Sequence, residues 1–192
     1  MPTRIDDWNQ RYRTGQQDFE TPAPLVVQFT RDLTPGAALD LACGPGRNAL
    51  YLAQRGWAVF AVDGSEVAID LLHARARQQK LTVSADVADL EAGGIGAPVE
   101  GFDLVLSCYY LQRSLIPLMK AALRPGGLLI MIVNLAGGDQ PQGTPTRAFP
   151  GELASFFEGW PILHYQEGDP DGSGHRHAVA EFVTQKPAGM RC

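Results

Sequence analysis

The stretch Leu39-Asp40-Leu41-Ala42-Cys43-Gly44-Pro45-Gly46-Arg47-Asn48 decides the fold, because a short apolar run ends there at closely spaced glycines. Ala37–Leu41 is predicted to be a strand, and Arg47–Arg55 a helix that Gly56 ends. Glycines between a strand and a helix let the backbone approach a ligand, and the helix N-terminus presents free N–H groups. The stretch therefore predicts a ligand-binding turn.

An acid follows the next predicted strand, Ala58–Val62, about twenty residues after the glycines. Asp63 lies at the position where an acid can accept both hydroxyls of a ribose. The spacing thus favours a ligand that carries a nucleoside. A tight turn with a helix-capping acid is the alternative explanation of the same residues.

Strands and helices alternate along the rest of the chain. Helices are predicted after the caps Ser65 and Ser114, and again at Phe149–Phe157. The remaining strands are predicted at Leu81–Ala85, Phe102–Ser107, Leu128–Asn134, Pro161–Gln166 and His177–Gln185. This order predicts an α/β fold: a Rossmann-like, doubly wound, mostly parallel seven-stranded sheet with a C-terminal antiparallel hairpin.

The chain length suits one domain, which we place at residues 1–186, with 187–192 as a tail. Within it we expect a helical or lid segment at 1–33, a cofactor-binding core at 34–135, and a C-terminal helix and hairpin at 136–186. The net charge of −5 argues against a nucleic-acid-binding surface. The sequence carries neither a predicted membrane span nor a signal peptide, so we expect a cytoplasmic protein.

Three cysteines, Cys43, Cys108 and Cys192, show no C-x-x-C spacing and are expected to be reduced thiols. No His and acid accompany them in a pattern that favours a nucleophile. His175 and His177 could share one face of a strand, but the sequence shows no third His or Cys to complete a metal site, and none is predicted.

Two ligand classes fit a glycine turn of this kind. Gly44-Pro45-Gly46-Arg47-Asn48-Ala49 formally matches the G-x-G-x-x-A fingerprint of NAD(P)-binding reductases. That fingerprint places its glycines against a pyrophosphate, whereas Asp40 would bring negative charge close to those phosphates. A ligand that carries an amino acid and a sulfonium tolerates this acid.

The motifs as a set resemble class I S-adenosylmethionine-dependent methyltransferases. Asp40 to Asn48 resembles motif I, with Asp63 as its acidic partner, and Ala85-Asp86-Val87 resembles the pair that holds the adenine. Phe102-Asp103-Leu104-Val105 and Leu123-Arg124-Pro125-Gly126-Gly127 resemble the motifs around the fourth and fifth strands. Ala42 departs from the fullest form of motif I, which has glycine there.

The resemblance implies a role for each matching residue. Gly44 and Gly46 would lie beneath the methionine part of S-adenosylmethionine and Asp63 at the ribose. Asp86 would meet the adenine amino group, with Asp89 or a plain surface turn as the alternative. The complete predicted cofactor set is Asp40, Ala42, Gly44, Gly46, Asn48, Asp63, Gly64, Asp86, Val87, Ser107 and Cys108.

The N-terminal segment is similar to the lid of the tellurite-resistance and thiopurine methyltransferase branch. Trp8, Tyr12 and Phe19 would cover the cofactor, unless the segment is an ordinary amphipathic helix. Tyr109 and Arg176 are the other candidates for the acceptor pocket, and Tyr110 could equally lie in the core.

The sequence thus predicts an S-adenosylmethionine-dependent methyltransferase that acts on a small molecule, with a soft nucleophile such as a thiol or a chalcogen oxyanion as the candidate acceptor. An NAD(P)-binding reductase and a non-catalytic S-adenosylmethionine-binding protein are the alternatives. No general base and no oligomeric state can be assigned from the sequence.

Overall fold

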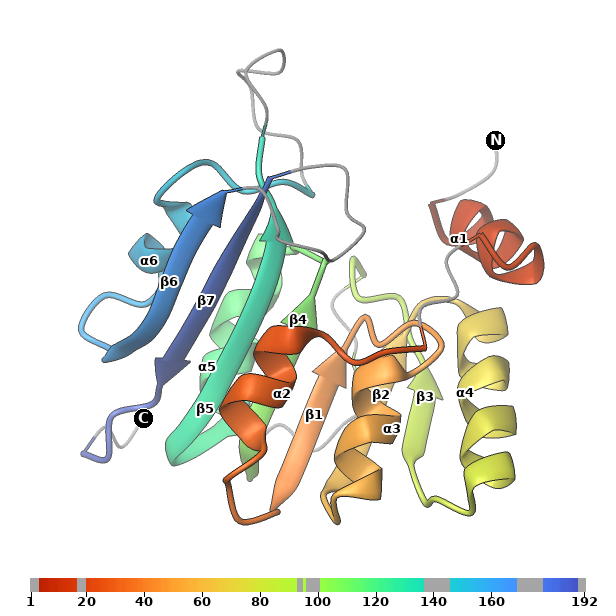
Figure 1. Cartoon of the computed structure of the whole chain (residues 1–192). Coiled ribbons are helices and arrows are strands. Elements are labelled where there is room, and N and C mark those ends of the chain that lie inside the picture. The colour runs from red at the N-terminus through yellow and green to blue at the C-terminus, as the bar shows by residue number, and fades with distance from the viewer. Residues whose placement is uncertain are drawn as a thin grey trace. The chain divides into compact units, whose positions relative to one another are not determined.

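The strands form one seven-stranded sheet in the order β3-β2-β1-β4-β5-β7-β6. The computed structural model describes residues 4–16, 20–92, 95, 101–136, 146–168 and 178–189 (Figure 1). Strand β2 pairs in parallel with both β1 and β3, whereas β7 pairs antiparallel with both β5 and β6. The predicted fold class and the C-terminal antiparallel hairpin are confirmed. The chain divides into two compact units, Met1–Ala97 and Pro98–Cys192, which are described in turn.

The first unit is a three-stranded parallel sheet with four helices. Its elements are α1 (Arg4–Arg13), α2 (Pro24–Thr30), β1 (Ala37–Leu41), α3 (Arg47–Gln54), β2 (Ala58–Asp63), α4 (Glu66–Gln79) and β3 (Ser84–Val87). The inner strand residues are buried, as near-continuous apolar runs predict for covered strands. Within this unit α1 lies beyond the carboxyl ends of the strands, beside the start of α4 (Figure 1).

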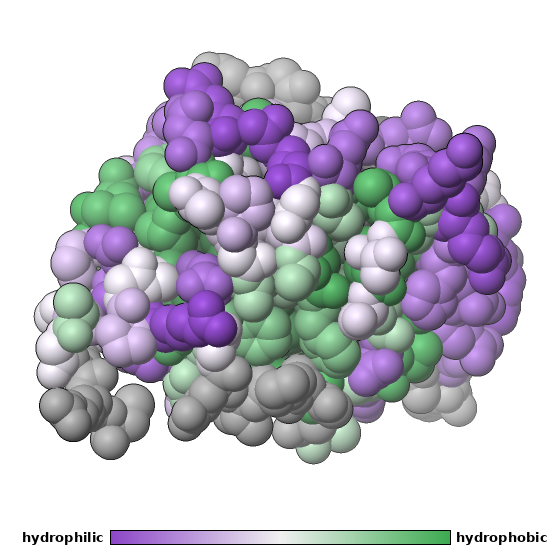
Figure 2. All heavy atoms as spheres, turned by 90° about the horizontal axis from the view of Figure 1, so that it is seen from below, coloured by the Kyte–Doolittle hydropathy of each residue, from purple (hydrophilic) through white to green (hydrophobic). Residues whose placement is uncertain are grey.

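Helix α4 shows how sequence and packing agree in this unit. Ser65 caps it by accepting a hydrogen bond from the Ala68 amide, as predicted from the sequence. Ala68, Ile69, Leu72 and Ala76 form its buried stripe, while residues 77–80 at its far end are exposed. Hydrophilic colours accordingly predominate at that side of the molecule in Figure 2.

The second unit holds the other four strands, of which β6 and β7 form the C-terminal hairpin. Its elements are β4 (Phe102–Cys108), the 3-10 turn η1 (Arg113–Leu115), α5 (Ile116–Ala122), β5 (Leu123–Asn134), α6 (Glu152–Phe156), β6 (Ile162–Gly168) and β7 (Val179–Gln185). Strand β4 pairs in parallel with β5, and β6 forms the edge. No described helix is both long and apolar enough to cross a membrane.

Several of the predicted boundaries are wrong. Strand β5 starts at Leu123 and not at Leu128, and helix α6 starts at Glu152 and not at Phe149. Ser114 does not cap a helix: it lies inside η1, and α5 begins at Ile116 after Leu115, which gives no side-chain cap. The third strand starts at Ser84 and not at Leu81, because the Leu81 amide is still bonded to the Ala76 carbonyl at the end of α4. The shift places Asp86 and Val87 inside β3, at its carboxyl end.

Candidate cofactor site

The glycine turn between β1 and α3 is built from left-handed backbone. Ala42, Gly44 and Gly46 have φ values of 55°, 55° and 86°. A side chain on Gly46 would stand 2.6 Å from Leu72 Cγ, so this glycine is required for packing against α4 as well as for the turn. Ala42 adopts a conformation that costs an alanine about 1–2 kcal/mol, which explains why glycine suits this position.

Asp63 fixes the turn to the end of β2. Its Oδ2 accepts the Gly44 amide and its Oδ1 the Ser65 amide, both at 2.8 Å. Burial raises the pKa of this carboxyl, and the two amides oppose that shift. A carboxylate offers about four acceptor positions, so two remain for the hydroxyls of a ribose.

Asp40 is buried at the same turn with an unsatisfied oxygen. Only 1% of its surface is exposed, and Oδ2 has no hydrogen-bond partner in the described structure. Desolvation raises the pKa of Asp40 to about 7, while Arg47 and the Ala49 amide pull it down. An acceptor that is buried and unpaired is costly, and a ligand donor is the simplest means of satisfying it.

Helix α1 lies over the turn and carries two of the predicted lid residues. The position of a Cβ on Gly44 would be 3.0 Å from the Tyr12 hydroxyl. Trp8 stacks on Tyr12, with 5.6 Å between ring centroids, and the Arg11 guanidinium lies 4.9 Å from the Trp8 ring. Ile5 approaches Gly64 in the same way, at 3.1 Å from its would-be Cβ. Burial and the nearby Asp63 raise the pKa of Tyr12, so its hydroxyl stays protonated.

The predicted adenine residues lie at the end of β3, next to β2. Val87 pairs with Asp63 in the sheet and Asp86 with Val62. Both side chains are exposed, and Val87, at 53%, is among the most exposed apolar residues described. Asp89, the alternative to Asp86, instead accepts the Glu91 amide in a local turn. Because successive side chains of a strand point to opposite faces of the sheet, the Asp86 side chain and the Val87 backbone are the groups that one adenine could contact together.

Asn48, which was predicted to bind the cofactor, also holds the start of α2 in place. It is 4% exposed, and its Oδ1 accepts the Ala23 amide at 2.9 Å, at the start of α2. The structure thus gives this side chain a structural partner. Burial, and after it the charges of Asp63 and Asp40, raise the pKa of the Cys43 thiol in the same turn, so it is a poor nucleophile.

Ser107, Cys108 and Tyr109 belong to the second unit, at the end of β4. The Ser107 hydroxyl is buried and donates to the Tyr110 carbonyl. Tyr109 is half-buried with a φ of 63°, and its amide donates to the Ile132 carbonyl. A left-handed tyrosine is uncommon, and such strain is found most often at functional sites.

Several predictions fall on residues outside the described ranges: Phe19, Arg176, His175, His177 and Cys192. They stay predictions. Among the described residues, no group of three or more His, Cys, Asp or Glu could hold a metal ion.

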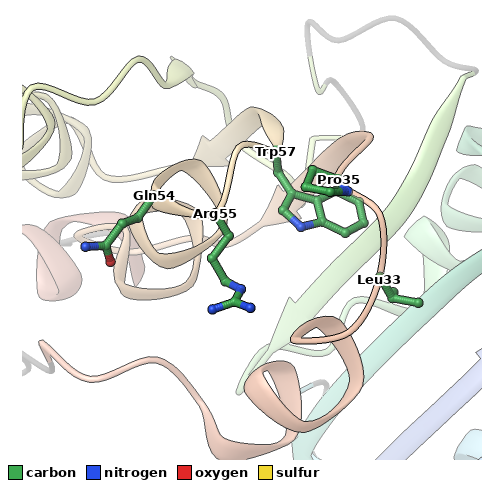
Figure 3. A pocket seen from close by; sticks show the side chains of 5 residues that line it. All are labelled: Leu33, Pro35, Gln54, Arg55 and Trp57. Carbon is green, nitrogen blue, oxygen red and sulfur yellow. The ribbon is translucent and has the colours of Figure 1, made fainter.

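A surface recess in the first unit is distinct from the glycine turn. It is lined by Leu33, Pro35, Gln54, Arg55 and Trp57, which come before β1 and around the start of β2 (Figure 3). Ligands of doubly wound sheets bind at the carboxyl ends of the strands, and this recess lies at the amino ends. It is therefore not the candidate site.

The sequence did not reveal Asn9. It is the buried residue of α1, 8% exposed, and its Oδ1 accepts the Ser65 hydroxyl at 2.5 Å. One signal could have placed Asn9 on the inner face of the helix: it lies four residues after Ile5 and three before Tyr12, which is the spacing of residues on one helix face.

Comparisons with known proteins agree with this geometry. The model of the family "Tellurite resistance protein TehB" matches residues 8–180. The "Probable S-adenosyl-L-methionine-dependent methyltransferase TehB" of Haemophilus influenzae is 30% identical over 177 residues, which cover 84% of this chain and 61% of that protein. "Hemagglutinin 1" of Eikenella corrodens is 30% identical over 162 residues, covering 81% and 54%.

The crystal structure of TehB from Haemophilus influenzae superposes with a TM-score of 0.75 and 25% identity, over 93% of this chain and 67% of that one. The chain thus spans 54% to 61% of the length of the two curated relatives. The family match covers both the glycine turn and β7 up to residue 180. The chain belongs to the tellurite resistance TehB family.

Proposed function

We propose that this chain is an S-adenosylmethionine-dependent methyltransferase that acts on a small-molecule acceptor. The observation that carries the proposal is the glycine turn, where a buried acid with an unpaired oxygen, Asp40, adjoins a second acid, Asp63, in a chain of the TehB family. Bound S-adenosylmethionine supplies an electrophilic methyl group on a sulfonium. The chain's own residues bind, orient and enclose the reactants.

Asp40 discriminates between the two cofactor classes. S-adenosylmethionine carries an ammonium group, which can donate to the unpaired Oδ2 and stabilise its ionised form. The pyrophosphate of NAD(P) would bring negative charge to the same buried acid, with no donor for it. The donor and acceptor pattern of the turn therefore fits the amino-acid end of S-adenosylmethionine.

The other contacts follow from the positions of the acids. Asp63 would accept the ribose hydroxyls with its remaining lone pairs, and Asp86 the adenine amino group. The backbone amide of Val87 would contact the adenine ring. Trp8 and Tyr12 on α1 would exclude water from the methionine end.

The acceptor is proposed to be a soft nucleophile, a thiol or a chalcogen oxyanion, in keeping with the family's tellurite resistance. With tellurite, a lone pair on tellurium forms the new bond to carbon, and sulfur keeps the electron pair of the bond that breaks. The products are a methyltellurium oxyanion with one less negative charge and S-adenosylhomocysteine. The tellurite dianion has no proton to lose, and a thiol would release its proton to solvent to react as the thiolate, so alignment is the main requirement.

The acceptor-side residues proposed on this chain are Tyr109, Phe19 and Arg176, while Ser107 and Cys108 are proposed to border the methyl-donor end of the cofactor. The strained Tyr109 backbone supports a role for the end of β4, because proteins retain such strain where function needs it. No general base is assigned.

The test is production of S-adenosylhomocysteine in the presence of tellurite, selenite, small thiols and small amines. The proposal expects turnover with a soft nucleophile that is lost in Asp63→Asn and retained in Asp70→Asn, an exposed acid of α4. Cofactor binding without turnover on any acceptor would favour the non-catalytic alternative. Turnover on amines alone would keep the methyltransferase and overturn the acceptor class.

A further inference from the structure

Helix α1 is attached to the first unit through a buried polar side chain. Asn9 is its buried residue, and Oδ1 accepts the Ser65 hydroxyl at 2.5 Å and the Val67 amide at 3.4 Å. An apolar residue would pack the helix equally well, but only a side chain with an acceptor can hold α1 in register with Ser65. The ion pairs of α1, Arg4 with Glu91 and Arg13 with Glu66, are largely exposed and contribute little.

Ser65 connects α1 to the proposed ribose acid. Its hydroxyl donates to Asn9 and accepts the Ala68 amide, which caps α4. Its amide donates to Asp63 Oδ1 at 2.8 Å, and Asp63 Oδ2 holds the Gly44 amide. A continuous series of hydrogen bonds therefore runs from α1 to the glycine turn.

The same face of α1 covers that turn. Ile5, Asn9 and Tyr12 are spaced four and three residues apart, so they share one face of the helix. Ile5 lies against Gly64, and the Tyr12 hydroxyl against Gly44. A ligand on the glycine turn would lie beneath Tyr12, so the docked α1 would cover it.

We propose that Asn9 is a positioning residue that couples docking of α1 to retention of the cofactor, through Ser65 and Asp63. This inference rests on the proposed function. Opening of α1 breaks the Asn9–Ser65 hydrogen bond. Because Ser65 also orients Asp63, a ribose held by Asp63 stabilises the docked helix, and the docked helix slows release of the ligand.

The test compares Asn9→Leu, which keeps the branched heavy-atom skeleton and removes the acceptor, with Gln10→Ala, an exposed neighbour on the same helix. Preloaded S-adenosylhomocysteine is chased with excess S-adenosylmethionine in a stopped-flow experiment. Loss of one buried hydrogen bond should speed release about three- to tenfold. Asn9→Leu should also raise the cofactor KM more than it lowers kcat, while Gln10→Ala behaves as the parent chain.

Hydrogen exchange of residues 4–13 without ligand gives a second readout that does not depend on the proposed function. Asn9→Leu should accelerate exchange of α1, and Ser65→Ala should add no further acceleration there in the double variant. If the parent chain fails to bind S-adenosylhomocysteine, the proposed function fails while this readout still reports on docking. Unchanged exchange, or faster exchange with an unchanged release rate from a ligand that binds, would overturn the coupling.

Discussion

Two kinds of buried polar group can be compared between the units. In the second unit, Lys186 is 6% exposed, and its Nζ donates to the Lys120 and Leu123 carbonyls at 2.8 Å. Thr184 is fully buried, and its hydroxyl donates to the Pro161 carbonyl. In the first unit, Asp40 is as deeply buried but keeps an oxygen without a partner.

The difference separates groups that complete the fold from groups that await a ligand. Lys186 satisfies carbonyls at the end of α5, which would otherwise be unpaired. Asp40 leaves a desolvated acceptor unpaired at the carboxyl end of β1, where ligands of this fold bind. Two further unpaired buried atoms, Tyr51 Oη and Trp57 Nε1, lie in the first unit too; Trp57 lines the recess of Figure 3.

The largest effect on stability is expected at Gly46. Gly46→Ala adds a Cβ at 2.6 Å from Leu72 to a backbone with a φ of 86°, so both overpacking and left-handed strain oppose folding. We expect a loss of about 4 kcal/mol in the free energy of unfolding, measured in urea. Gly126→Ala in the second unit is the matched control, since its φ is 81° and nothing lies within 4 Å. Equal losses in the two variants would show that Leu72 yields and that packing does not require this glycine.

The next effect tests the fold-completing group. Lys186→Met keeps an unbranched side chain, one atom shorter, and removes the donor to the Lys120 and Leu123 carbonyls. We expect a loss of about 2–3 kcal/mol in the free energy of unfolding. The dissociation constant for S-adenosylhomocysteine, measured by calorimetry below the melting temperature, should not change. A variant as stable as the parent would remove the contrast between the units.

Asp40, the unpaired acid, should make the free energy of unfolding depend on pH. Its pKa is raised in the folded state, so the native protein holds this proton more tightly than the unfolded chain does. The stabilisation is complete below the unfolded pKa and is lost as the pH rises through about 7. Asp40→Asn should therefore reduce the fall in unfolding free energy between pH 5 and pH 8 by on the order of 2 kcal/mol.

The same ionisation should appear in ligand binding. An ammonium group beside Asp40 favours the ionised form, so affinity for S-adenosylhomocysteine should rise from pH 5.5 to pH 8 in the parent chain. The rise should be smaller in Asp40→Asn. Identical pH profiles of binding in both proteins would mean that the unpaired oxygen does not face the ligand.

The smallest effect is expected at Ala42. Ala42→Gly relieves a φ of 55° and gives the turn the residue that motif I has in its fullest form. The gain is about 1 kcal/mol at most, because glycine also loses more backbone entropy on folding. Thermal melts of the parent chain and the Ala42→Gly variant measure this difference in stability. A lower melting temperature for the glycine variant would show that the alanine carries no strain.

The parts of the fold that local chemistry specifies were predictable from the sequence. β1 and β2 are apolar runs that stop at glycines or an acid, and Ser65 caps α4 in the usual manner. The position of Asp63 at the end of β2 followed from the strand itself. These features depend on residues a few positions apart, which periodicity and capping rules capture.

The features that long-range contacts decide were not predictable. Asn9 is paired with Ser65, 56 positions away, and Lys186 with Leu123, 63 positions away, so neither partner is visible in a local pattern. Serine is a favourable residue type for a helix cap, but Ser114 lies inside the 3-10 turn η1, which precedes α5. The raised pKa of Asp40 likewise depends on burial by residues from the whole unit.

The most direct test of the central claim is a comparison of ligands in thermal melts. S-adenosylhomocysteine at a hundred times its dissociation constant should stabilise the protein by about 2.7 kcal/mol, a shift that a melt resolves readily. NAD and NADP at the same concentration should leave the melting temperature unchanged. Stabilisation by NADP and not by S-adenosylhomocysteine would contradict the assignment of the glycine turn to S-adenosylmethionine.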